Sequence, residues 1–191
     1  AIRDFRFPDR IVVGSNNTKV SKKMEVLYDP LIKKGAKFFI TNRRGAEMIK
    51  YASNAFLATK ITYLNEIANL CENIGVNVED VSIGIGLDQR IGSRFLRAGP
   101  AYGGSCFPKD TKAITVIGDL HKIDLSIIKS VIKSNDKRRT ILIERIKKIL
   151  SNKIKKKKIA FLGVTFKPNT DDMRQSSSLL MIPYLHKKGA K

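Results

Sequence analysis

The sequence predicts an α/β chain whose middle is mainly helical, and three observations support this class. Residues 10–14 and 37–41 are short apolar runs with a helical pattern between them. Residues 45–73 contain no proline and place apolar side chains on nearly every face of a helix. A further apolar run, 159–164, precedes another helical pattern. Alternating strands and helices are typical of parallel sheets, whereas the central stretch indicates a separate helical region.

The N-terminal part reads as strand, helix, strand. The run Arg-Ile-Val-Val-Gly at 10–14 predicts the first strand, and residues 37–41 predict the second. Between them, apolar residues recur at helical spacing from Lys19 to Lys34, and Gly35 ends that helix. Such a unit is typical of the closing part of an α/β domain.

The long central helix, about 45–73, is predicted to be buried. A helix that is apolar all round lies either in the centre of a domain or in a subunit interface. Lys50 and Asn54 stand four residues apart and therefore share one face. Spacing alone leaves two interpretations open: a functional pair, or a lysine that extends to the surface beside an asparagine bonded to a backbone carbonyl.

The remaining elements follow from caps and periodicity. Asn77 is expected to cap a short helix that ends near Ile85, after Gly75 has ended the long one. Three more helices are predicted, at 111–121, 126–150 and 178–188, and the apolar continuity of 159–164 predicts a buried strand. Residues 88–92 and 166–172 are predicted loops.

Composition limits the function classes. The 191 residues are 42% hydrophobic, which is enough for a packed core, and no apolar run approaches the length of a membrane span. Two cysteines make no disulfide framework, so a reducing cytoplasm is expected. Two histidines argue against a histidine-based metal site or a Ser-His-Asp triad, and no metal is expected.

The net charge of +20 has two interpretations. Clustered lysines neutralise phosphates in nucleic-acid-binding proteins. Here the lysines are scattered, apart from the run at 153–158, and no aromatic residues or known binding motifs accompany them. We therefore expect the charge to attract an anionic substrate such as a nucleotide.

The segment Gly-Gly-Ser-Cys-Phe-Pro-Lys-Asp at 103–110 carries the most chemical information. Glycines allow a tight turn, and Pro108 suits the first turn of a helix, so Cys106 is expected at a helix N-terminus. The helix dipole and Lys109 would both favour the thiolate, which attacks carbonyl carbon. By itself, the segment also fits a tight turn that holds a buried structural cysteine, which is the commoner role of a lone cysteine.

Four motifs together resemble the UDP-glucose 6-dehydrogenase family, within the wider group of nucleotide-sugar dehydrogenases. They occur in the family's order along essentially the whole chain, at 46–56, 95–99, 103–110 and 166–174. The resemblance implies the last part of an NAD-binding Rossmann domain at 1–43, a central helical, catalytic and dimerisation domain at 44–152, and the first strand and helix of a UDP-binding Rossmann-like domain at 153–191. It also implies a fragment, without the glycine fingerprint of the NAD site.

The family reaction, which the resemblance implies here, oxidises the 6-hydroxymethyl group of UDP-glucose to the carboxylate of UDP-glucuronate with two NAD+ and one water. Cys106 would hold the aldehyde as a thiohemiacetal and then as a thioester. Lys50 and Asn54 would stabilise the negative charge on oxygen, and Asp110 would orient a water or accept a proton. Cys71 is expected to be inert core.

Further roles carry over by motif. The residues expected to bind substrate are Lys50, Asn54, Arg90, Phe95, Leu96, Arg97, Ala98, Gly99, Gly103 and Lys167. Lys109 and Arg174 resemble NAD contacts, Arg90 resembles a residue that reaches the neighbouring subunit's substrate, and the long helix is expected to form a homodimer. The alternatives are a dehydrogenase for UDP-N-acetylmannosamine or GDP-mannose, or a non-catalytic dimerising remnant. The isolated chain is expected to be inactive.

Overall fold

Contacts divide the chain into two compact units. The computed structural model describes residues 2–191, and the units are Ala1–Ser53 and Asn54–Lys191. The boundary falls within the longest helix, α3, which spans Arg43–Ile74. Each unit is described below by itself.

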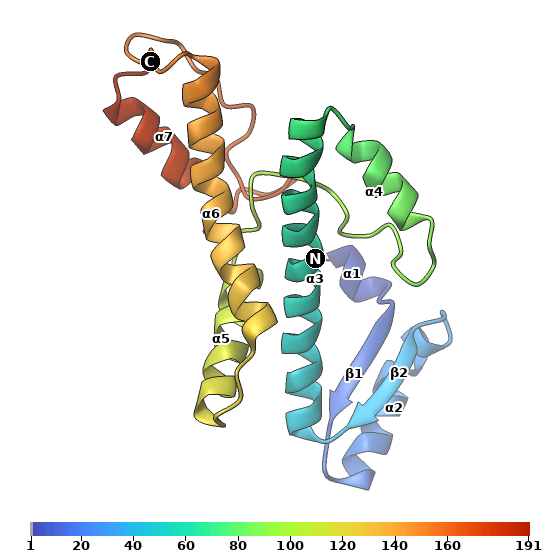
Figure 1. The fold of residues 1–191 in the computed structure, drawn as a ribbon. Helices are drawn as coiled ribbons and strands as arrows, with labels where there is room; N and C mark the ends of the chain where they lie inside the picture. The colour runs from blue at the N-terminus through green and yellow to red at the C-terminus, as the bar shows by residue number, and fades with distance from the viewer. Residues whose placement is uncertain (1) are drawn as a thin grey trace. The chain divides into compact units, whose positions relative to one another are not determined.

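The first unit contains the predicted strand, helix and strand (Figure 1). Strand β1 (Arg10–Gly14) pairs in parallel with β2 (Lys37–Thr41), with Arg10 opposite Lys37 and Gly14 opposite Thr41. Helix α2 (Thr18–Ile32) connects the two strands. A parallel pair requires such a crossover, so the α/β prediction for this part is confirmed.

A side-chain cap explains where α2 begins. The Asn17 side chain accepts hydrogen bonds from the backbone N–H groups of Lys19 and Val20, at 2.9 and 3.2 Å, which satisfies two donors of the first turn. A small core of Ile11, Val13 and Ala36 holds the strands together. The short helix α1 (Ile2–Arg6) precedes β1 and was not predicted.

Helix α3 confirms the predicted long helix, but residues 2–191 cover only part of its apolar surface. Ala58 and Leu64 are fully buried. Phe56, Tyr63 and Leu70 are 65%, 52% and 55% exposed. The uniform burial that the composition predicted is therefore not present within the described chain, and one apolar face remains open.

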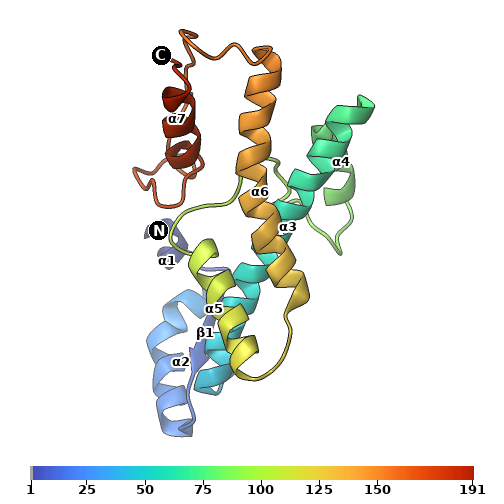
Figure 2. The ribbon, with the colours of Figure 1, turned by 60° about the vertical axis from the view of Figure 1, so that its left-hand side comes forward.

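Four further helices lie in the second unit. They are α4 (Val78–Gly86), α5 (Phe107–Leu120), α6 (Ser126–Ile149) and α7 (Ser178–Lys187). Helix α6 packs against both α5 and α7 (Figures 1 and 2). Helix α5 begins four residues before its predicted start, because Pro108 occupies its first turn. The other three confirm their predictions to within a residue or two.

The predicted strand at 159–164 is not formed, so that prediction was wrong. Backbone hydrogen bonds join Lys156, Lys157 and Ile159 to residues 189–191, at 2.7–2.9 Å. The pairing ends at Ile159, and Leu162 is 99% exposed. A strand needs a neighbour along its length, and apolar continuity in the sequence does not supply one.

No helix in the described part of the chain combines the length and the apolarity needed to cross a membrane.

Candidate active site

Cys106 lies at the N-cap position of α5, where the sequence places it. The residue is exposed, with φ −90° and ψ −63°, and its backbone carbonyl accepts the Asp110 N–H at 2.8 Å. Its Sγ lies 3.7 Å from Ser105 Oγ. The open N–H groups and the positive end of the helix dipole therefore lie beside an accessible sulfur.

Asp110, one turn into α5, is buried and pairs with the half-buried Asn54 of α3. Asp110 is 1% exposed, and its Oδ2 accepts a hydrogen bond from Asn54 Nδ2 at 2.5 Å. Its Oδ1 accepts from Lys109 Nζ. A carboxylate buried this deeply requires such partners, because removing an unpaired charge from water costs several kcal/mol. The structure thus brings together three predicted site residues, Cys106, Asp110 and Asn54.

Lys50 lies in the other compact unit, exposed on α3 and four residues before Asn54. The helix continues through both residues, so they share one helical face. A position for Lys50 beside Cys106 remains an expectation from the sequence.

A depression of about 520 Å³ opens around Cys106. Its lining consists of Gly104, Ser105, Cys106, Pro108, Lys109, Lys112, Arg174 and Gln175. Three of these side chains are cationic and none is anionic, so the depression suits an anionic ligand. Within residues 2–191, no group of three or more His, Cys, Asp and Glu side chains is placed to hold a metal ion.

Arg174 is oriented by a forked ion pair on the rim of this depression. Its Nε and Nη2 donate to the two carboxylate oxygens of Asp172, at 2.9 and 2.8 Å. These hydrogen bonds raise the pKa of Arg174 and lower the pKa of Asp172 to about 2. The geometry fixes a planar cation near Cys106.

The predicted sugar-nucleotide loop runs toward Cys106 from α4. Leu96 is buried, and its carbonyl accepts from Ser82 Oγ. Phe95, with a φ of 65°, meets the ring edge of Phe107 at 6.1 Å between centroids. Arg97 is exposed and Ala98 is half-buried.

Gly103 closes this loop against the segment before α7. A Cβ at Gly103 would lie 2.5 Å from the carbonyl oxygen of Gln175, so only glycine fits. A Cβ at Gly104, whose φ is 79°, would lie 2.6 Å from the ring of Phe166. The two glycines therefore allow the cysteine loop and the 166–175 segment to approach closely.

Arg90 and Lys167 lie outside the lining of the depression. Arg90 is exposed and donates through Nη2 to Asp88 Oδ2 at 2.6 Å, which raises its own pKa and lowers that of Asp88. Lys167 is exposed, with Nζ 5.3 Å from the centroid of the Phe166 ring. These contacts involve only neighbouring residues of the same chain. The expected roles of Arg90 and Lys167 in binding substrate therefore stay predictions.

Sequence reasoning missed the buried polar residues behind the loop. Asn65 and Asn135 are each 3% exposed, and Arg138 is 6% exposed. All three bond to the loop backbone. The sequence did contain a signal for them. Asn135 and Arg138 stand three residues apart on one helix, and Asn65 is a polar residue within an apolar helix.

Family models match the chain in two places. The central domain of the UDP-glucose/GDP-mannose dehydrogenase family matches residues 44–137, and the UDP binding domain of the same family matches residues 160–191. The chain belongs to the UDP-glucose/GDP-mannose dehydrogenase family. The fold class inferred from the sequence is confirmed by this membership.

Individual relatives agree with this family. A UDP-glucose 6-dehydrogenase of Rickettsia prowazekii is 52% identical over 188 residues, which cover 98% of this chain and 43% of the relative. The structure of a UDP-glucose dehydrogenase from Pyrobaculum islandicum superposes with a TM-score of 0.93 at 36% identity, covering all of this chain and 43% of that one. A UDP-D-ManNAc dehydrogenase from Pyrococcus horikoshii gives 0.83 at 26% identity, over 98% and 44%. The chain thus spans less than half the length of these relatives.

Proposed function

We propose that this family member oxidises the 6-hydroxymethyl group of UDP-glucose to a carboxylate, with NAD as hydride acceptor and Cys106 as covalent nucleophile. The observation that carries the proposal is the arrangement around Cys106. An exposed thiol stands at the start of α5, one turn from the buried Asp110 that Asn54 bonds, and within a cationic depression. Its similarity to UDP-glucose 6-dehydrogenases supports the choice of sugar.

Cys106 accounts for a four-electron oxidation at one site. NAD, when bound, accepts the hydride released in each of the two oxidations. Cys106 Sγ bonds to the aldehyde carbon and retains it, first as a thiohemiacetal and then, after the second oxidation, as a thioester. Water then attacks the carbonyl carbon, the C–S bond breaks, and the carboxylate leaves while the sulfur recovers its original state. The reactive aldehyde is never released.

Asp110, Asn54 and Lys50 assist these steps. Asp110 orients the water or accepts its proton, because its carboxylate lies one turn from Cys106 and is held by two donors. Asn54 and Lys50 present an amide donor and a cation from one face of α3, where negative charge develops on the substrate oxygen. This assignment of Lys50 rests on the sequence motif.

The residues present fit a bound dinucleotide. Lys109 and Arg174 line the depression beside Cys106, and their charges complement the phosphates of NAD. The first unit supplies one β-α-β unit of a Rossmann-like domain. We therefore expect residues 1–191 alone to be inactive, and a version extended to the length of its relatives to be active.

The loop binds the sugar nucleotide and α3 forms a homodimer. Residues 95–99, together with Gly103, would surround the sugar nucleotide, with Lys167 at its anionic end and Arg90 reaching the neighbouring subunit's substrate. The open apolar face of α3 is the surface for the second copy. The free thiols of Cys71 and Cys106 are consistent with a cytoplasmic location.

NADH formation tests the reaction. The extended protein and residues 1–191 are each given UDP-glucose, UDP-N-acetylmannosamine or GDP-mannose, and NADH is counted per sugar. We expect two NADH per UDP-glucose from the extended protein, none after Cys106→Ser, and normal stoichiometry after Cys71→Ala. Cys71 is the matched control because it is a buried thiol of α3 that does not line the depression around Cys106.

Two other results would redirect the proposal. Turnover confined to UDP-N-acetylmannosamine or GDP-mannose would retain the chemistry and change the substrate. A folded, extended protein that oxidises none of the three sugars would support the non-catalytic dimerising alternative.

A further inference from the structure

The loop that leads into Cys106 is held from behind by three buried side chains of α3 and α6. Asn65 Oδ1 accepts the Gly99 N–H at 2.8 Å, and Arg138 Nε donates to the Gly99 carbonyl at 3.1 Å. Asn135 Oδ1 accepts the Tyr102 N–H at 2.8 Å, and its Nδ2 donates to the Tyr102 carbonyl at 3.2 Å. Both backbone groups of both loop residues are therefore bonded.

These bonds constrain an otherwise unfavourable backbone. Ala101, between the two bonded residues, has a φ of 143°, and Phe95 and Gly104 also have positive φ values. Non-glycine residues adopt such conformations only where their surroundings impose them. Asn65, Asn135 and Arg138 supply this constraint, together with buried Ser177, whose Oγ donates to the Pro100 carbonyl at 3.1 Å.

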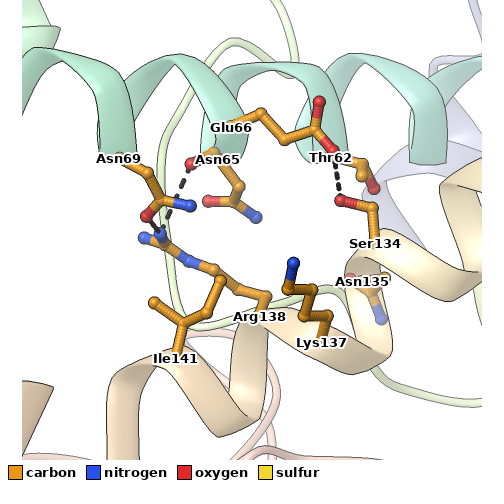
Figure 3. A pocket seen from close by; sticks show the side chains of 9 residues that line it. All are labelled: Thr62, Asn65, Glu66, Asn69, Ser134, Asn135, Lys137, Arg138 and Ile141. Carbon is orange, nitrogen blue, oxygen red and sulfur yellow. Dashed lines mark hydrogen bonds between the residues drawn. The ribbon is translucent and has the colours of Figure 1, made fainter. Parts of the chain in front are cut away.

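Arg138 is itself fixed by α3. Its Nη1 donates to the Asn65 carbonyl at 3.3 Å and to Asn69 Oδ1 (Figure 3). These acceptors are uncharged carbonyl and amide oxygens, and burial lowers the pKa of the guanidinium. A buried cation that spans two helices and a loop has few alternative positions.

The constraint reaches Cys106 through Tyr102. The Tyr102 ring is buried with Ala58 and Val131, and it meets the ring of Phe107 edge-on at 6.0 Å between centroids. Phe107 directly follows Cys106 and begins α5. Displacement of Tyr102 would therefore move the first turn of α5, on which the sulfur sits.

We propose that Asn65, Asn135 and Arg138 are positioning residues that hold loop 95–105, and through it Cys106, in the geometry that oxidation requires. The inference rests on the proposed function for the reaction, but the constraint on the loop is measurable without turnover. Errors of about 1 Å in the position of a reacting group reduce rates by about 100-fold.

A matched pair of arginine variants tests the proposal in the extended protein. Arg138→Gln removes the bond to the Gly99 carbonyl, whereas Arg145→Gln removes an ion pair with Glu72 and a weaker bond to Asn69, which also join α6 to α3 but do not reach the loop. For Arg138→Gln we expect kcat to fall by about 10- to 100-fold, with KM for UDP-glucose changed less. Arg145→Gln should retain kcat within about 3-fold.

A second pair of variants isolates the bond made by the Gly99 N–H. Asn65→Leu deletes the acceptor of the Gly99 N–H, while Asn65→Asp retains an oxygen there. We expect hydrogen exchange of the peptide containing 95–105 to accelerate by about 10-fold or more in Asn65→Leu and in Arg138→Gln. The rate at which iodoacetamide alkylates Cys106 should also change in Asn65→Leu and Arg138→Gln. Asn65→Asp should restore both measurements toward the parent values.

Two outcomes would overturn the inference. If Arg138→Gln and Arg145→Gln lowered kcat and accelerated exchange equally, Arg138 would only join the helices. If Arg138→Gln and Asn65→Leu left loop exchange, alkylation and kcat unchanged, the loop would not depend on them. If the parent protein oxidised no nucleotide sugar, the proposed function would fail, and exchange and alkylation would still decide whether the three residues hold Cys106.

Discussion

Asp110 shows how burial and chemistry combine at a single residue. Its carboxylate has almost no exposed surface, yet it lies one helical turn from an accessible thiol and is bonded by Asn54 and Lys109. A position this costly is typical of a group that acts in catalysis or holds one that does. In the proposed mechanism, the exposed Cys106 bonds to the substrate carbon and the buried Asp110 accepts a proton or orients the water.

The first prediction concerns Asp110→Asn in the extended protein. The amide preserves the shape but cannot accept a proton, so we expect kcat to fall by about 100-fold or more while KM for UDP-glucose changes little. Steady-state NADH formation measures both constants. Asp119→Asn is the control, since that carboxylate also lies on α5 but pairs with Lys129 at the surface. Equal losses in the two variants would contradict a chemical role for Asp110.

The second prediction concerns how much the ionised Asp172 carboxylate stabilises the fold at low pH. Its pKa is lowered from 3.8 to about 2, chiefly by hydrogen bonds from Arg174. A lowered pKa means that the folded state favours the ionised form, so this stabilisation is present above about pH 4 and is lost as the pH falls toward 2. Asp172→Asn should lower the thermal midpoint slightly at pH 6, and the difference from the parent should vanish near pH 2. A difference that persisted unchanged at pH 2 would contradict this origin, and Asp171→Asn serves as the neighbouring control.

At the scale of elements, local signals predicted most of the fold. The caps and apolar spacing located α2, α3, α4, α6 and α7, because each signal acts within a few residues. The strand at 159–164 failed because strand formation depends on a partner distant in sequence, and here the pairing stops at Ile159. Local patterns do not contain that information.

The candidate site shows the same difference between local signals and contacts that are distant in sequence. Cys106 and Asp110 were predictable because they lie in one helical turn, and Asn54 followed from its motif on the long helix. Arg138 was not predictable, because its bonds reach Gly99 and Asn65, which lie 39 and 73 positions away along the chain. Polar residues in apolar helices indicate buried bonds, but the sequence does not identify their partners.

The third prediction tests the close approach between two elements at Gly103. Gly103→Ala places a Cβ within 2.5 Å of the Gln175 carbonyl, which must shift. We expect a loss of about 1–3 kcal/mol in the free energy of unfolding, measured with urea. Gly84→Ala is the control, because it lies on exposed α4 with nothing within 4 Å of the new Cβ. That variant should be neutral or more stable by up to about 1 kcal/mol.

At the scale of the whole molecule, the open face of α3 requires an explanation. Phe56, Tyr63 and Leu70 recur every seven residues, so they lie along one side of the helix. All three are more than half exposed within the described chain. A continuous apolar stripe on a long helix is typical of a surface that another helix covers. The family resemblance predicts that this helix is α3 of a second copy.

The last prediction follows from this stripe. In the extended protein, Phe56→Asp combined with Leu70→Asp should weaken self-association by about 100-fold or more, because two buried carboxylates would face the partner's apolar side chains. Sedimentation velocity at micromolar concentrations should show a dimer for the parent and a monomer for the double variant. Leu120→Asp is the control, since Leu120 is 77% exposed at the end of α5 and lies outside the stripe. A double variant that remained dimeric would place the interface elsewhere. A monomer that kept its helical circular dichroism but lost activity would further indicate that each site depends on the second subunit, the role that the family resemblance predicts for Arg90.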